Sequence, residues 1–161
     1  MVLIAHCGKV LRLPLRSYRL YNWVSQLRFD LIKANGRFKA RLVLKGFTQI
    51  QGIDYEETFS PVSRYESIQY ILAHAALLDW QIEAMDVKTA FLYGELKEEI
   101  YMEHPEGFVV KGQEKKVCKL VKSIYGLKQA RQVWYELMAD TLRRKLGFDQ
   151  IHSDAGVYVL R

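Results

Sequence analysis

The chain has 161 residues, of which 50% are hydrophobic and 26% charged, and its formal net charge is +6. This length suits one domain, which would bury about 70% of the surface that the unfolded chain exposes. The composition excludes an intrinsically disordered chain, because disorder combines low hydrophobicity with high charge. The positive charge favours a polyanionic partner such as nucleic acid, since phosphate contacts release condensed counterions.

Cysteine usage and the length of the apolar runs exclude a disulfide scaffold, a zinc site and a membrane span. Cys7 and Cys118 are too few and too far apart in sequence for a disulfide scaffold or a zinc site. No apolar run approaches the roughly 18 residues of a membrane span. We therefore expect a reduced, intracellular compartment and no membrane partner.

The first part of the chain predicts a hairpin. Residues 1–22 show no clean period, and we assign them no structure. Two strand-like runs follow, at residues 23–32 and 37–47, and between them lies Ala34-Asn35-Gly36. The Asn-Gly pair suits the positive backbone angles of a tight hairpin turn.

One face of the second strand is basic. Side chains alternate along a strand, so Lys39, Arg41 and Lys45 fall on the face opposite the apolar one. Such a face is either solvated or a phosphate grip, because Lys and Arg are the usual phosphate ligands. The pattern alone leaves both interpretations open.

A helix is predicted over residues 64–79. Ser63-Arg64-Tyr65-Glu66 has the form of a capping box, in which Ser and Glu satisfy the first backbone amides. Apolar residues recur at steps of three and four and predict one face that packs against a core. These residues are Ile68, Ile71, Leu72, Ala75 and Leu78.

Asp86 follows a short apolar run. Residues 81–85 predict a short buried strand that delivers Asp86, and residues 90–92 predict a turn or short helix that leads to Gly94. An Asp at the end of a strand commonly caps a turn. Its position alone therefore does not assign it a catalytic role.

The remainder predicts further strands and a second helix. Strands are expected at residues 98–102, 117–121 and 156–160, with a turn at 105–107. The second helix follows Tyr125-Gly126-Leu127 and stops near Gly147. Its apolar stripe is Ala130, Val133, Trp134, Leu137, Met138 and Leu142. Together these elements predict an α+β fold, with two main helices on one side of a largely antiparallel sheet.

Five segments resemble, in order and spacing, the copia-type retrotransposon reverse transcriptases. They are KARLVLKGFTQ (39–49), GIDYEETFSPV (52–62), DVKTAFLYGEL (86–96), EEIYMEHPEGF (98–108) and SIYGLKQA (123–130). The resemblance covers residues 23–161 and leaves residues 1–22 outside it. It implies the fingers and part of the palm of a right-hand polymerase fold, and an intracellular location in the cytoplasm or nucleus.

The resemblance implies a role for the Asp86 segment. Asp86 resembles the first metal-binding carboxylate of the palm, with the backbone carbonyl of Val87 beside it. Nucleotidyl transfer uses two divalent ions roughly 3.5–4 Å apart, and Mg²⁺ prefers such oxygen ligands. Phe91, next to Ala90, resembles the aromatic residue under the sugar that excludes a ribose 2′-hydroxyl. A plain core Phe is the alternative interpretation.

Further positions are implied to bind substrate. Lys39 and Arg41 resemble the fingers residues that hold the triphosphate of the incoming deoxynucleotide. Tyr125, Gly126 and Gln129 resemble the loop that lines the nucleotide pocket and touches the template, where a glycine lets the backbone approach closely. The implied partners are an RNA template, an RNA–DNA hybrid and deoxynucleoside triphosphates.

The chain also departs from the family pattern. Arg131-Gln132 stands where Pro-Arg or Ser-Arg is common, and Gln26 stands where a Lys is usual. The Tyr-x-Asp-Asp segment of the central catalytic hairpin is expected after residues 157–160 and is missing. Asp149 and Asp154 precede that strand and cannot replace it.

These departures set the functional expectations. With Asp86 as the single recognisable metal carboxylate, we expect no primer extension by this polypeptide alone. A fold truncated before the catalytic hairpin exposes a strand edge and apolar surface, so we also expect self-association. The alternatives are a non-catalytic nucleic-acid-binding module and a relic without function.

Overall fold

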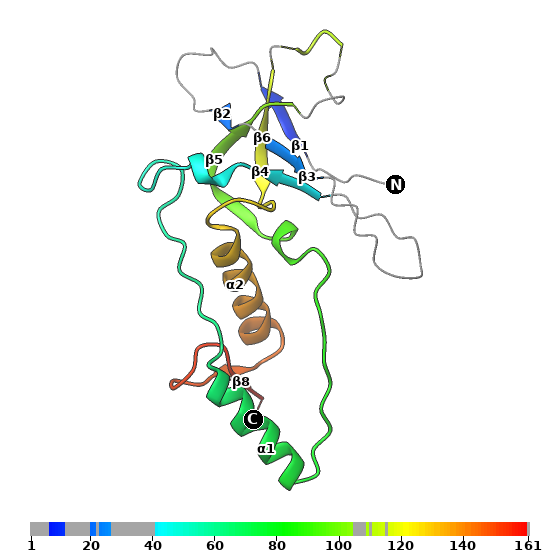
Figure 1. The fold of residues 1–161 in the computed structure, drawn as a ribbon, viewed down its shortest axis with the longest axis vertical. Coiled ribbons are helices and arrows are strands. Elements are labelled where there is room, and N and C mark those ends of the chain that lie inside the picture. Colours follow the sequence, from blue (N-terminus) through cyan, green and yellow to red (C-terminus); the bar gives the residue numbers. More distant parts are fainter. Residues whose placement is uncertain are drawn as a thin grey trace.

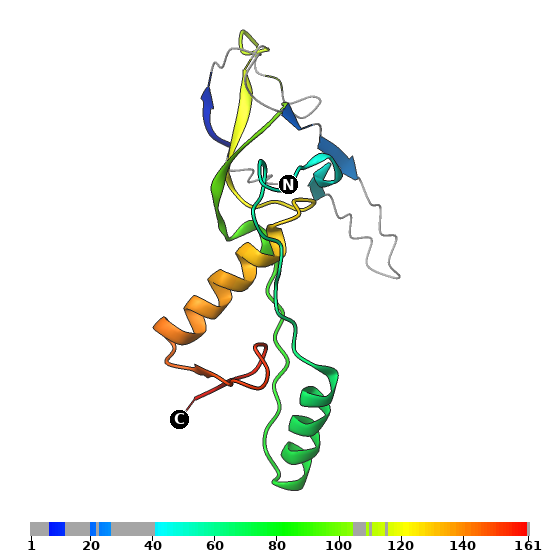
Figure 2. The ribbon, with the colours of Figure 1, turned by 90° about the vertical axis from the view of Figure 1, so that its left-hand side faces the viewer.

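The computed structural model describes residues 7–11, 20–21, 23–26, 41–104, 109, 111–114 and 116–160. The architecture is α+β with two helices and mainly antiparallel strands, as the sequence predicted. The described strands form three small sheets, so the prediction that both helices lie on one side of a single sheet is wrong. Figures 1 and 2 show the two sheets of the first six strands at one end of the molecule, helix α2 in the middle, and helix α1 toward the other end, where the C-terminal hairpin also lies.

The largest sheet has four strands in the order β1 (Cys7–Leu11), β6 (Val117–Lys122), β5 (Glu95–Met102) and β2 (Leu20–Tyr21). Strand β6 pairs antiparallel with both β1 and β5, whereas β2 pairs parallel with β5. The predicted strands at 98–102 and 117–121 are confirmed, and β5 begins earlier than predicted. Residues 1–22, to which the sequence assigned no structure, supply β1 and β2. The turn expected at 105–107 lies outside the described residues.

A second sheet pairs β3 (Trp23–Gln26) with β4 (Arg41–Leu44) in antiparallel register. This confirms the predicted pairing, while the Asn-Gly turn and Lys39 lie outside the described residues. Strand β4 ends at Leu44, earlier than predicted, because the chain turns at the 3-10 helix η1 (Gly46–Thr48).

The core lies between the two sheets and the start of α2. Its buried residues are Leu44, Ile100, Met102, Cys118, Leu120, Leu127 and Ala130. Leu42, Phe91, Leu96 and Ile124 pack against this cluster and are partly buried. Apolar burial contributes roughly 25 cal/mol per Å². This cluster therefore fixes β4, β5, β6 and the start of α2 relative to one another.

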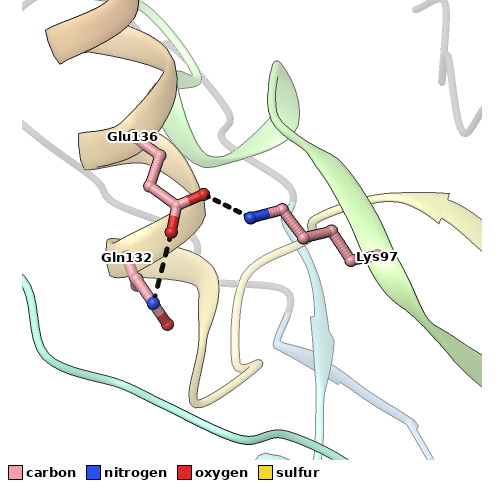
Figure 3. A network of polar contacts seen from close by, with 3 residues as sticks. All are labelled: Lys97, Gln132 and Glu136. Carbon is pink, nitrogen blue, oxygen red and sulfur yellow. Dashed lines mark hydrogen bonds and ion pairs between the residues drawn. The ribbon is translucent and has the colours of Figure 1, made fainter.

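Helix α2 (Ala130–Asp140) continues into a π-helical turn, η3 (Thr141–Lys145). The apolar stripe predicted for this helix is buried or half-buried, which confirms it. The residue before strand β5 lies close against α2, since a Cβ on Gly94 would overlap the side chain of Val133. Figure 3 shows a second link, in which Lys97 Nζ of β5 lies 2.9 Å from Glu136 Oε2 of α2.

Helix α1 (Tyr65–Leu77) stands away from the sheets (Figures 1 and 2). The prediction that its apolar stripe packs against a core is wrong for the described residues. Of the stripe, Ala75 alone is buried, and Leu78 is 50% exposed. The 3.6-residue period is sufficient to form the helix, but a packed face also needs an element opposite it. Most of this face is therefore exposed in the described structure.

The predicted capping box is also wrong. The N-cap of α1 is Arg64, and neither it nor Ser63 donates or accepts a capping side-chain bond. Instead Asp154 Oδ2 accepts a hydrogen bond of 2.8 Å from the amide of Arg64. Asp154 lies between strands β7 (Asp149–Gln150) and β8 (Tyr158–Val159), which form an antiparallel hairpin. A tertiary contact thus replaces the local cap.

The strand predicted at residues 81–85 is absent from the described structure. Residues 81–89 are exposed, and residues 81–87 have extended coil backbone with no pairing strand. A strand needs a neighbour that supplies backbone hydrogen bonds, and within the described residues no strand or bridge pairs with residues 81–85. Within the described residues, neither helix has the length and apolar character needed to cross a membrane.

Candidate nucleotide-binding site

Asp86 lies on the exposed segment between α1 and the 3-10 helix η2 (Ala90–Leu92). Its neighbours are also exposed, with Met85 at 91% and Val87 at 49%. The carboxylate makes no hydrogen bond or ion pair with another described residue. It is therefore open to solvent and to ligands.

A strained residue turns the chain between Asp86 and Phe91. Thr89 has φ 56° and ψ 35°, in the left-handed region, and its carbonyl accepts the first bond of η2 from Leu92 at 2.8 Å. A β-branched residue rarely adopts a positive φ, and such strain is concentrated at functional sites. Beyond this turn the chain changes from exposed coil to the half-buried Ala90 and Phe91.

Phe91 meets Tyr125 edge to face. Their ring centroids lie 5.7 Å apart with an interplanar angle of 88°. This is a favourable arrangement for two aromatic rings. Both side chains are half-buried, and Phe91 also packs against the core. Phe91 thus has a structural role while its side chain stays partly exposed.

The backbone of Tyr125 and Gly126 is joined directly to strand β4. The amide of Leu44 donates to the carbonyl of Tyr125 at 2.8 Å, and Val43 forms a bridge with Tyr125. Gly126 has φ +92°, and a Cβ there would overlap the carbonyl oxygen of Leu44. A Cβ on Gly46 would in turn overlap the carbonyl oxygen of Gly126. The two glycines allow the backbone of residues 44–46 to touch the backbone at Gly126.

Gln129 lies inside the protein and is 1% exposed. Its Oε1 accepts from Gln49 Nε2 at 3.1 Å, and its Nε2 donates to the carbonyl of Asp54 at 3.1 Å. Gln49 Oε1 accepts from the amide of Lys128 at 2.9 Å. The amide of Gln129 is thus occupied by the protein itself on both its oxygen and its nitrogen.

The motifs and geometry can be compared with known proteins. The family model for reverse transcriptase (RNA-dependent DNA polymerase) matches residues 10–161. The chain belongs to the reverse transcriptase family. The match begins at residue 10, inside the segment that the motif comparison had left out.

Curated relatives point to retrotransposons. The chain is 52% identical over 139 residues to the retrovirus-related Pol polyprotein from transposon TNT 1-94 of Nicotiana tabacum, with 86% of this chain and 10% of the relative covered. It is 44% identical, with the same coverage, to the Pol polyprotein from transposon RE2 of Arabidopsis thaliana. A transposon Ty1-ER2 Gag-Pol polyprotein of Saccharomyces cerevisiae is 30% identical over 131 residues, which are 78% of this chain and 7% of the relative. No solved structure matches.

These relatives define the type of reverse transcriptase. The chain is a copia-type reverse transcriptase segment of a retrotransposon Pol polyprotein, as the sequence motifs predicted. It spans about a tenth of the length of the plant relatives that it matches.

The structure brings some of the expected reverse transcriptase residues together. Phe91, Tyr125 and Gly126 are neighbours, and Arg41 begins β4, the strand whose Val43 bridges Tyr125. Asp86 is separated from this group by the turn at Thr89. Lys39 lies outside the described residues.

The described residues do not fit a complete metal site. Reverse transcriptases use divalent metal, and a two-ion centre needs several carboxylates around the ions. Among the residues with described side chains, no group of three or more His, Cys, Asp or Glu could hold a metal ion. Asp86 is part of no such group among these residues.

Sequence reasoning missed the residues that hold the Tyr125 loop in place. Gln49 and Asp54 stand in a segment without periodicity, so no pattern indicated their burial at 4% and 8% exposure. Gly46 carried a usable signal, because a glycine at the end of a strand often marks close backbone approach.

Proposed function

We propose that this chain supplies the nucleotide-binding side of an RNA-directed DNA polymerase site within a longer Pol polyprotein. Membership of the reverse transcriptase family supports the activity class. The observation that carries the proposal is the edge contact of Phe91 with Tyr125, beside the backbone bond from Leu44 to Tyr125. Through these two contacts, η2, strand β4 and the loop before α2 meet at Tyr125.

Within this site we assign Phe91 and Ala90 to the deoxyribose. An aromatic ring held by the core cannot withdraw, so an added 2′-hydroxyl would meet it. Tyr125 and the Gly126 backbone would line the same pocket, since Gly126 has no side chain to block a ligand.

Lys39 and Arg41 are proposed to bind the triphosphate, because cationic side chains form strong, charge-assisted bonds to phosphate oxygens. Asp86 and the carbonyl of Val87 are proposed as the oxygen ligands that this chain contributes for Mg²⁺. The template would be RNA, and the product an RNA–DNA hybrid. Further carboxylates would come from elsewhere in the polyprotein.

Nucleotide selectivity tests the proposal. Binding of dATP and ATP to the 161-residue chain, with Mg²⁺ present, can be measured by titration calorimetry. We expect dATP to bind more tightly, and Phe91→Ala to reduce that preference by about tenfold. Phe148→Ala is the matched control, because Phe148 is also half-buried but follows η3. Equal preference in wild type and Phe91→Ala would contradict the assignment. Primer extension by the chain alone should give no product.

A non-catalytic nucleic-acid-binding module is the second candidate. The net charge of +6 favours it, together with the lack of a metal-binding acid cluster in the described part of the chain. It predicts salt-dependent RNA binding that weakens in Lys39→Ala and Arg41→Ala but not in Asp86→Asn. Weakening by Asp86→Asn in Mg²⁺ would favour the polymerase site instead.

A further inference from the structure

Two glutamines 80 positions apart are joined inside the protein. Gln49 and Gln129 are 4% and 1% exposed, and a side-chain bond of 3.1 Å links them. Each amide also bonds to the backbone of the other's segment, because Gln129 donates to Asp54 and Gln49 accepts from Lys128. A buried polar group without a hydrogen-bond partner is costly. The two side-chain amides, the Asp54 carbonyl and the Lys128 amide therefore favour a single position of residues 49–54 relative to residues 128–129.

At the junction beside this pair, two backbone segments are in direct contact. Gly46 and Gly126 meet backbone to backbone, and glycines give little side-chain packing to hold such a contact. Lys128 makes two further contacts at the surface. Its Nζ lies 3.2 Å from the carbonyl oxygen of Gln49 and 5.2 Å from the ring centroid of Tyr55. The glutamine pair therefore adds a buried polar connection to the apolar contacts that Leu44 and Leu127 make in the core.

We propose that Gln129 and Gln49 form a latch that positions Tyr125 and Gly126 against strand β4. Gln129 acts on the nucleotide through the position of Tyr125 and makes no contact with the ligand. This inference rests on the proposed function only where it concerns nucleotide. The latch itself is a property of the free chain and can be tested without ligand.

Amide hydrogen exchange of the 161-residue chain tests the latch. In Gln129→Met and in Gln49→Met, the amides of Leu44 and Lys128 should exchange about tenfold faster, because the bonds that hold the junction are lost. Amides of β5 and β6 should keep their rates. The matched control is Gln132→Met, on the same helix, which removes only a bond of 3.3 Å to Glu136. It should leave the Leu44 amide unchanged.

The double variant distinguishes a mutual latch from two separate contacts. Each single variant leaves two polar groups without a hydrogen-bond partner, and one of these groups is on the other glutamine. The double variant leaves only the Asp54 carbonyl and the Lys128 amide without a partner. The acceleration in Gln49→Met/Gln129→Met should therefore be smaller than the product of the single effects. If Gln129→Met unfolds the chain, Gln49→Asn replaces it, because the shorter side chain no longer reaches Gln129.

Three results would overturn the latch. They are unchanged exchange at Leu44 and Lys128, equal acceleration throughout the sheet, and effects in the double variant that multiply. A chain that binds no dATP would contradict the proposed function, but the exchange rates would still decide the latch. If dATP binds, loss of affinity in Gln129→Met without faster exchange would show direct contact and overturn the positioning role.

Discussion

The carboxylate of Asp154 accepts a hydrogen bond of 2.8 Å from the amide of Arg64, which lies 90 positions earlier in the chain. The other carboxylate oxygen accepts from Gly156 at 2.8 Å. A Cβ on Gly156 would overlap Ser63 Oγ, so the hairpin of β7 and β8 touches the start of α1 directly. Helix α1 thus begins on a cap that a distant segment supplies.

This cap predicts acid sensitivity of α1. The hydroxyl of Ser67, followed by the amides of Arg64 and Gly156, lowers the pKa of Asp154. A lowered pKa in the folded state contributes stability above the unfolded value, about 3.9, and this stability is lost as the pH falls through the lower folded value. Circular dichroism should show helix loss on acidification, less steep in Asp154→Asn. Asp149→Asn, in exposed β7, is the control. Identical acid titrations of Asp154→Asn and wild type would refute this.

Replacing Gly126 is expected to cause a large loss of stability. Gly126→Ala combines a positive φ of +92° with overlap on Leu44, whereas Gly112→Ala has φ +83° and no atom within 4 Å of its Cβ. The positive φ costs roughly 1–2 kcal/mol in both. We expect Gly126→Ala to lose at least about 2 kcal/mol more, because backbone must move. Urea denaturation of both variants measures the difference, and equal losses would show that the contact with β4 is unimportant.

Replacing Thr89 with glycine is expected to raise the stability of the fold. Its φ of 56° strains a β-branched residue, so Thr89→Gly should raise the free energy of unfolding by about 1 kcal/mol. Asp79 has φ 55°, but Asp tolerates this region better, and Asp79→Gly should gain less. Thermal melting of the two variants tests the comparison. A loss of stability in Thr89→Gly would show that the threonine side chain stabilises the turn.

The ion pair of Lys97 and Glu136 predicts only a small coupling. The hydrogen bond to Glu136 raises the pKa of Lys97, but the two side chains are 82% and 44% exposed. Exposed pairs contribute roughly 0.2–1 kcal/mol, and salt screens them. A double-mutant cycle with Lys97→Met and Glu136→Gln measures this coupling. Arg144 and Asp140 give a reference pair of similar exposure within one helix segment. A coupling that salt does not change would contradict the surface character of the link.

The uncovered face of α1 predicts self-association of this chain. Ile68, Ile71 and Leu72 are 41–46% exposed, and Trp80 on the following segment is 57% exposed. Contiguous apolar surface of this kind promotes association. We expect oligomers in light scattering, reduced by Ile68→Lys with Leu72→Lys. The control is Lys substitution at Val159, an apolar residue of strand β8 that is 42% exposed and lies outside this face. A monodisperse wild-type monomer with a cooperative melt would contradict this.

Local pattern predicted the elements well where periodicity was strong. The stripe of α2 and the strands β5 and β6 were found because one face of each is buried against the core. The strand expected at residues 81–85 and the buried face of α1 were wrong, because an apolar run does not state what will lie opposite it. For the candidate site, Phe91, Tyr125 and Gly126 came from motif resemblance, and the structure makes them neighbours. Neither local periodicity nor motif resemblance indicated the role of Gln49.

The sequence by itself determined the family, the two helices and the aromatic and glycine positions of the candidate site, because these depend on local spacing and on motifs in order. Only the tertiary structure decided the partners. Asp154 caps α1, Gln129 turns inward to Gln49, and Gly46 meets Gly126. Each of these contacts joins residues about 80 or 90 positions apart. Hydrogen bonds and close packing between residues so far apart in sequence depend on the whole fold. The local periodicity of the sequence does not specify them.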